Sequence, residues 1–275
     1  MATTPLDAQQ KSYRPLPRYA QGPRPDQAEG RRILEEFRQL GIAGDYFLEF
    51  QLRVMPRRGD EHRLDGRWWG SRNAAGAISR LVVLPQGESG ETRLLVQNGV
   101  RPAAWRWSAP QARPEPLGLE ALFDRVADTD VTIFDLQMPF LHWNDFVFEG
   151  VAKVRGRPAQ TFLLYPPAEF SAAYPALTGV RVFLDLEFHA LVQAEQIGAE
   201  GRPLKAMTVL DLKKIGDQWI VKSIDLRDET TRNKTRFSVT GAALNLDFSP
   251  TLFSPEELSE PVAPPAAGQI SRIAP

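Results

Sequence analysis

Three histidines are the side chains best suited to acid–base or metal chemistry, and their spacing indicates neither. His62 lies in a loop dense in charged residues, where a solvated position accounts for it. His142 precedes Trp143 and fits a hydrogen-bonded interior histidine better than a catalytic base. His189 stands alone, and no two histidines have the i, i+4 spacing of a metal-binding helix. The histidines therefore predict no catalytic or metal centre.

Other patterns that carry catalysis or cofactor binding are also missing from the sequence. It contains no Gly-x-Ser-x-Gly nucleophile elbow, no P-loop and no Gly-x-Gly-x-x-Gly after a strand. It has no cysteine, which excludes thiolate nucleophiles, disulfides, thiolate metal sites and a lipid-modified N-terminal cysteine. Carboxylates grouped at 124–130 and 225–229 are typical of solvated strand ends. We therefore expect a non-enzymatic protein without cofactor or metal.

The net charge narrows the choice of partners. A formal charge of -1 argues against a nucleic-acid binder, because phosphate contacts need a clustered positive surface. No apolar run reaches the roughly 18 residues of a transmembrane helix. The sequence thus predicts neither nucleic-acid binding nor a transmembrane segment.

Aromatic side chains form the most suggestive group. The chain has 6 tryptophans and 15 phenylalanines, which could line a hydrophobic ligand cavity. They could equally do no more than fill a large core. Composition favours the core, whereas a half-closed sheet under an apolar cover would favour a cavity. Both interpretations stay open at this point.

The elements that must position these aromatics are predicted to be strands. The clearest stretch, Arg202 to Leu246, predicts three long antiparallel strands joined by tight turns. In the first of them, 204–213, apolar and charged residues alternate with a period of two. Strands of about ten residues exceed the usual five or six and indicate a large, curved, open sheet. One apolar face and one charged face are typical of an antiparallel sheet with one side in water.

The rest of the chain extends this pattern. An amphipathic helix should follow Asp26 as its N-cap, and further strands alternate from Tyr46 onward. The segment 110–144 breaks the alternation and is too apolar to lie in water, so it must pack on the sheet. The total is about a dozen strands, at which an open sheet curls or closes. We therefore predict a mainly β fold, a large curved antiparallel sheet forming an unclosed β-barrel, with a few covering α-helices.

Composition divides the chain into three regions. Residues 1–25 are polar and proline-rich and predict a disordered N-terminal arm. Residues 26–260 predict a single domain. Residues 261–275 are rich in proline and alanine and predict a disordered tail.

Several stretches together resemble the outer-membrane lipoprotein-sorting protein family with the LolA-like fold. The similar stretches are 136–143, 150–162, 164–167, 180–186, 201–205, 219–228, 234–237 and 253–258, with Glu195 and Phe248. The resemblance covers roughly residues 26–260 and rests on pattern and order rather than on a catalytic motif.

This resemblance implies a half β-barrel whose concave apolar face is covered by helices. It implies a non-enzymatic carrier that binds lipid or lipoprotein acyl chains in the periplasm. The first 25 residues lack the apolar core of a signal peptide, so the protein is either cytoplasmic or a mature form whose export signal has been removed. The resemblance implies export, and we therefore expect the second. The alternative is an envelope scaffold or protein-interaction module with a self-filled core and envelope proteins as partners.

Candidate ligand-binding residues are those predicted on the apolar face and its cover, and each could equally be plain core. They are Phe50, Leu52, Trp105, Trp107, Phe134, Leu136, Phe140, Leu141, Phe148, Phe162, Leu210 and Trp219. The assignment of faces comes from alternation alone, and a single bulge would invert half a strand.

Overall fold

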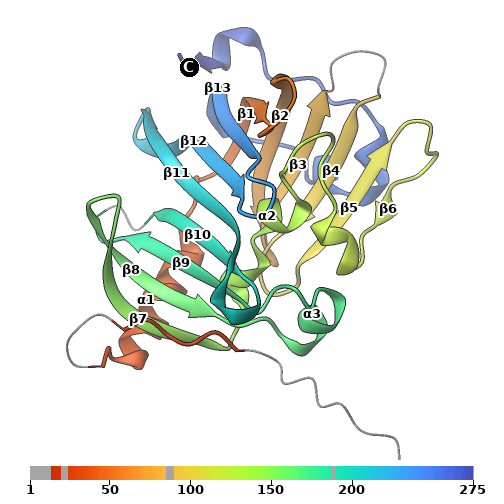
Figure 1. The fold of residues 1–275 in the computed structure, drawn as a ribbon. Coiled ribbons are helices and arrows are strands. Elements are labelled where there is room, and N and C mark those ends of the chain that lie inside the picture. Colours follow the sequence, from red (N-terminus) through yellow and green to blue (C-terminus); the bar gives the residue numbers. More distant parts are fainter. Residues whose placement is uncertain (1–13, 20–23, 85–89, 188–189, 275) are drawn as a thin grey trace, which may run out of the picture.

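The computed structural model describes residues 14–19, 24–84, 90–187 and 190–274. Within these residues the dominant feature is one 14-stranded antiparallel sheet that curls without closing (Figure 1). Its two edge strands are β6 and β7. The predicted fold class, an unclosed antiparallel sheet with a few helices, is confirmed.

The strand order shows how the sheet is assembled. Two consecutive meanders, β1 to β6 and β7 to β13, are joined because β1 pairs with β13. Across the sheet the strands are β6 (Glu115–Pro116), β5 (Ala103–Ser108), β4 (Thr92–Gln97), β3 (Gly76–Leu84), β2 (His62–Asn73), β1 (Asp45–Met55), β13 (Lys234–Leu246), β12 (Gln218–Asp228), β11 (Pro203–Ile215), β10 (Leu191–Ile197), β9 (Gly179–Asp185), β8 (Arg157–Leu164) and β7 (Phe146–Val154).

Helical elements are short, apart from α1. The α-helices are α1 (Gln27–Gln39), α2 (Ile133–Gln137) and α3 (Ala168–Ala173). Single 3₁₀ turns form η1 (Glu120–Phe123), η2 (Pro139–His142), η3 (Ala199–Gly201), η4 (Pro250–Phe253), η5 (Pro255–Ser259) and η6 (Ala267–Gln269).

The helix predicted after Asp26 is confirmed as α1. The Asp26 carboxylate accepts a hydrogen bond from the Ala28 amide at 2.9 Å and so caps the helix. Gly30 lets α1 approach the sheet closely, because a Cβ there would lie 2.4 Å from Phe148. The Gln27 side chain also exchanges two hydrogen bonds with the Phe148 backbone and thereby blocks the exposed edge of β7.

The two faces of the sheet carry different hydrophobic clusters. Leu94 belongs to the larger cluster and its neighbour Leu95 to the second, as alternate residues of a strand must. We call the face with the larger cluster the inner face and the other the outer face. The segment 110–144 contributes Phe134 and Phe140 to the larger cluster, so the prediction that it packs on the sheet is confirmed.

The terminal segments differ from the disorder that the sequence predicts. Ser271–Arg272 form a further strand, β14, which pairs with the C-terminal half of β13. That half of β13 has no partner in β12, so the tail fills an open strand edge and buries Ile270 and Ile273 on the way.

At the other end, the described residues 14–19 also lie against the sheet. The Arg14 guanidinium forms two hydrogen bonds with Asp145 and stacks over the Tyr165 ring. The Tyr165 hydroxyl donates to the Pro15 carbonyl at 3.0 Å. The remainder of the predicted arm, 1–13 and 20–23, lies outside the described residues, as does His189.

Candidate apolar binding site

The inner face is crossed by α2, which is placed by a short polar motif at its start. Thr132 is the N-cap, and its hydroxyl and the Asp135 carboxylate form a reciprocal capping box. The helix is only five residues long and ends where Met138 adopts a left-handed backbone conformation, with φ of 46°. In Figure 1, α2 lies between the two meanders of the sheet.

Buried polar side chains hold α2 to the strands on both sides. The Lys205 ammonium of β11 donates to the Asp135 carboxylate and to the Asp130 carbonyl, each at 2.7 Å. On the other side, the Gln137 amide donates to the carbonyls of Gln97 and Ala103 at 3.1 Å. Lys205 and Asp135 are almost fully buried, and the ion pair between them offsets the free-energy cost of removing both charges from water.

An apolar pocket of about 190 Å³ lies between α2 and the strands of the inner face. Among the described residues that line it, Asp135 is the one charged residue, and it is already hydrogen-bonded to Lys205 and Gln196. The remaining lining residues are Phe50, Leu52, Trp68, Leu81, Val83, Val126, Val131, Leu136, Met138, Ala190, Leu191, Met207, Val209, Val221, Ile224, Leu226 and Phe237. Such a site offers apolar contact and hardly any polar recognition.

The structure brings three of the twelve candidate residues to this pocket: Phe50, Leu52 and Leu136. Five others belong to or pack against the same inner cluster without lining the pocket. These are Phe134, Phe140, Leu141, Phe148 and Phe162.

Two candidates, Trp105 and Trp107, lie on the outer face. Their neighbour Ala104 belongs to the inner cluster, so alternation directs both tryptophans to the other side. Trp105 pairs across the sheet with Leu95, which is also an outer-face residue. The sequence pattern could not distinguish the faces, because both are apolar in this part of the sheet.

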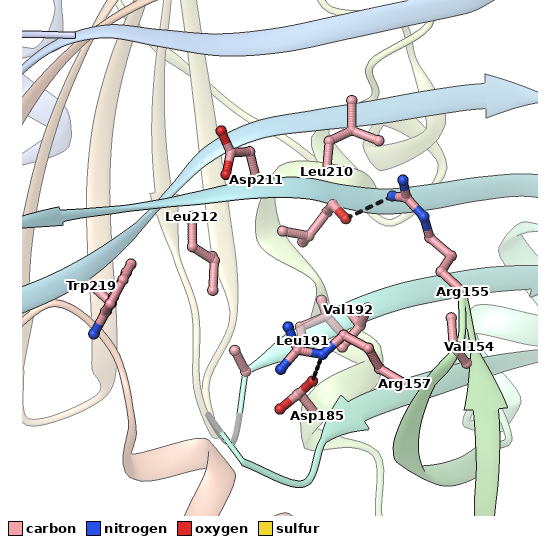
Figure 2. Close-up of a pocket in the computed structure, with 12 residues that line it drawn as sticks. Val154, Arg155, Arg157, Asp185, Leu191, Val192, Leu210, Asp211, Leu212 and Trp219 are labelled. Carbon is pink, nitrogen blue, oxygen red and sulfur yellow. Dashed lines mark hydrogen bonds and ion pairs between the residues drawn. The ribbon is translucent and has the colours of Figure 1, made fainter.

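The last two candidates, Leu210 and Trp219, line a separate groove of about 430 Å³ (Figure 2). Trp219 is 53% exposed, since its neighbour Ile220 takes the buried position. Met207 and Val209 line the inner pocket, so alternation along β11 places Leu210 on the opposite face.

Several lining residues escaped the sequence analysis. Trp68 and Phe237 surround Phe50, with ring centroids 6.5 and 5.0 Å from it. Met207 and Leu226 pair directly across β11 and β12. These residues meet because of the register between paired strands, and a single sequence does not reveal that register.

The described histidines carry no catalytic arrangement. A ring nitrogen of His62 lies 3.1 Å from the Asp128 carbonyl at an exposed position. Burial lowers the pKa of His142, and the charges of Arg38 and Arg72 lower it further. Within the described residues, three or more metal-ligating side chains do not gather anywhere. In the same part of the chain, every helix is too short or too polar to cross a membrane.

Solved structures with the same architecture define the class of fold. A DUF1329 family protein from Desulfovibrio piger aligns with a TM-score of 0.72 at 13% identity, covering 85% of this chain and 99% of that one. A domain assigned to outer membrane lipoprotein sorting, from Vibrio parahaemolyticus, aligns with a TM-score of 0.72 at 16% identity, covering 83% and 97%. A LolA superfamily protein from Nitrosomonas europaea aligns with a TM-score of 0.62 at 14% identity. The alignment covers 82% of this chain and 96% of that one.

The chain therefore has the LolA-like fold, as its resemblance to the lipoprotein-sorting family implies. By sequence, the chain belongs to a family described as "Uncharacterized protein", whose model matches residues 84–260. A comparison with curated proteins finds no match.

Proposed function

We propose that this protein is a non-enzymatic carrier that binds lipid or lipoprotein acyl chains between α2 and the inner face of its sheet. The observation that carries the proposal is the apolar pocket, where Asp135 is the single charged residue among the described lining residues and is already paired. Burying a hydrocarbon chain there gains roughly 25 cal/mol for each Å² removed from water.

The proposed location is the periplasm. The similarity to a lipoprotein-sorting domain and to a LolA superfamily protein supports this environment. In it, a carrier must shield acyl chains from water between membranes, and a concave apolar pocket suits that task.

The test is native mass spectrometry of the full chain purified from a host with normal lipids, followed by extraction of bound lipids and titration with a fluorescent fatty acid. Leu136→Trp should fill the pocket and reduce uptake of the probe about tenfold or more, because Leu136 lies in its wall on α2. Leu40→Trp, at a leucine that is 51% exposed and outside the pocket, is the matched control. Equal uptake by both variants would contradict binding at this site.

A self-filled scaffold is the alternative, and one observation favours it. Around Phe134, aromatic rings pack closely, with centroids of Phe123, Phe140, Trp143 and Phe170 at 4.8 to 6.3 Å. This part of the space beneath the cover is already occupied by the protein. A clean apo mass together with no uptake of the fatty-acid probe would exclude the carrier and leave the scaffold.

A further inference from the structure

Strands β10 and β11 separate part of the way along the sheet. Their pairing extends from Ile197 opposite Pro203 to Gln193 opposite Thr208. Beyond Thr208, β11 continues beside β12 to Ile215, while the described part of β10 no longer pairs with it. The groove of about 430 Å³ in Figure 2 lies at this separation.

The groove and the inner pocket share part of their walls. Ala190, Leu191 and Val209 line both. The groove and the inner pocket are therefore neighbours at the place where the strands separate. Leu210 and Trp219 extend the apolar wall outward from there.

Charged side chains stand at the outer end of the groove. Arg157 lies 3.0 Å from the Asp185 carboxylate and 3.3 Å from that of Glu187, so its charge is balanced locally. Asp211 lies 3.5 Å from the Lys222 ammonium.

Arg155 is different from these paired residues. Its guanidinium donates to the Val209 carbonyl at 3.3 Å, as Figure 2 shows, and within the described residues it forms no ion pair. A neutral carbonyl is a weaker partner for a guanidinium than a carboxylate or phosphate, which can form charge-assisted hydrogen bonds.

We propose that the groove binds the acidic headgroup of a single-chain amphiphile whose hydrocarbon chain passes between β10 and β11 into the inner pocket. The headgroup, a carboxylate or phosphate monoester, accepts hydrogen bonds from Arg155 in place of the Val209 carbonyl. One chain is inferred because 190 Å³ is below the roughly 300–1,000 Å³ of typical ligand pockets. This inference rests on the proposed function and adds the charge of the ligand to it.

The experiment compares dodecanoate with dodecanol, which has the same chain without the charge, by calorimetric titration of the full chain at pH 8. The unaltered protein should bind dodecanoate about fivefold more tightly than dodecanol, as expected for one solvent-accessible charge contact. Arg155→Glu should weaken dodecanoate binding by about tenfold and leave dodecanol within about twofold. Arg101→Glu changes the net charge equally at an exposed site far along the sheet, between β4 and β5, and should alter neither affinity.

The outcomes separate this inference from the function on which it rests. Equal affinity of the unaltered protein for the two ligands, or an equal loss in Arg155→Glu and Arg101→Glu, would overturn the headgroup site while the acyl carrier stands. Binding of neither ligand would overturn the carrier and the headgroup site together. Dodecyl phosphate in the same titration tests whether a phosphate headgroup can replace the carboxylate. If Arg155→Glu loses binding of dodecyl phosphate and Arg101→Glu keeps it, the result supports the headgroup site.

Discussion

The two faces of the sheet are both apolar in the first meander, yet they are covered in different ways. On the outer face, η4 and η5 pack Phe253 and Leu258 against Leu95, and these side chains complete a second core. On the inner face, the five-residue α2 crosses a concave surface and leaves a pocket of about 190 Å³. The comparison teaches that what leaves a pocket here is how well the cover fits the sheet, not how apolar the sheet is.

Arginine side chains seal the outer cover. Arg80 of β3 is 1% exposed and donates to the backbone carbonyls of Leu252, Glu257, Leu258 and Glu260. Burial, followed by the nearby charge of Arg93, lowers the pKa of Arg80 to about 10, so the guanidinium stays protonated near neutral pH. These bonds supply a charged donor to carbonyls at the ends of two 3₁₀ turns, where Glu257 also accepts from the Glu260 amide and Leu258 from Arg93.

The inner cover is fastened by polar side chains that lie on the two sides of α2. Lys205 and Gln137 fix the two sides of α2, and the space between them is the apolar pocket. The outer cover is held along its length and the inner cover at its two sides. Loss of a fastening residue should therefore change the free energy of unfolding by different amounts in the two covers.

The largest effect is expected at the inner cover. Lys205→Met should lower the free energy of unfolding by about 3–5 kcal/mol, because it leaves the Asp135 carboxylate buried without its cation. Denaturant unfolding measures this loss. In the double variant Lys205→Met/Asp135→Leu, much of the loss should be recovered. If the double variant is as unstable as the single one, the ion pair is not what holds α2.

A smaller effect is expected at the outer cover. Arg80→Met should lower the free energy of unfolding by about 2–3 kcal/mol, since several carbonyls lose a charged donor but no buried counter-charge is left behind. Its uptake of a fluorescent fatty acid should remain that of the unaltered protein. Loss of uptake in folded Arg80→Met would break the distinction between a sealed outer face and a binding inner face.

Much of this architecture follows from local sequence signals. Period-two alternation predicts the long strands from 202 to 246, and Asp26 with its following apolar stripe predicts α1. The apolar character of 110–144 predicts a segment that packs on the sheet, as Phe134 and Phe140 do. These features depend on residues close together in the chain.

Features that depend on distant pairing could not be predicted. Trp105 and Trp107 lie on the outer face because their neighbour Ala104 faces the inner cluster. The tail pairs with β13 because β12 leaves half of that strand unpaired. Lys205 and Asp135 are 70 residues apart, and one clue was the single acidic residue within the apolar run 131–141. That clue identifies a buried charge without identifying its partner.

The smallest effect is expected beyond both covers, where Asp225 of β12 meets Arg236 of β13 at 2.6 and 2.9 Å. Burial alone would raise the pKa of Asp225, but hydrogen bonds and charge from Arg236 and Lys234 outweigh it and lower the pKa below 3.8. The pair therefore stabilises the fold fully above about pH 4. That contribution is lost as the pH falls through the lowered pKa.

Asp225→Asn should consequently reduce the free energy of unfolding by about 1 kcal/mol or less at pH 6, and by less still at pH 3. Urea unfolding at the two pH values measures the difference. Asp60→Asn removes the same charge at an exposed residue and serves as the control. A deficit in Asp225→Asn that is as large at pH 3 as at pH 6 would mean that its cause is packing rather than charge. In that case the Asp225–Arg236 pair would differ from the Lys205–Asp135 pair beneath the inner cover, whose contribution is expected to come from charge.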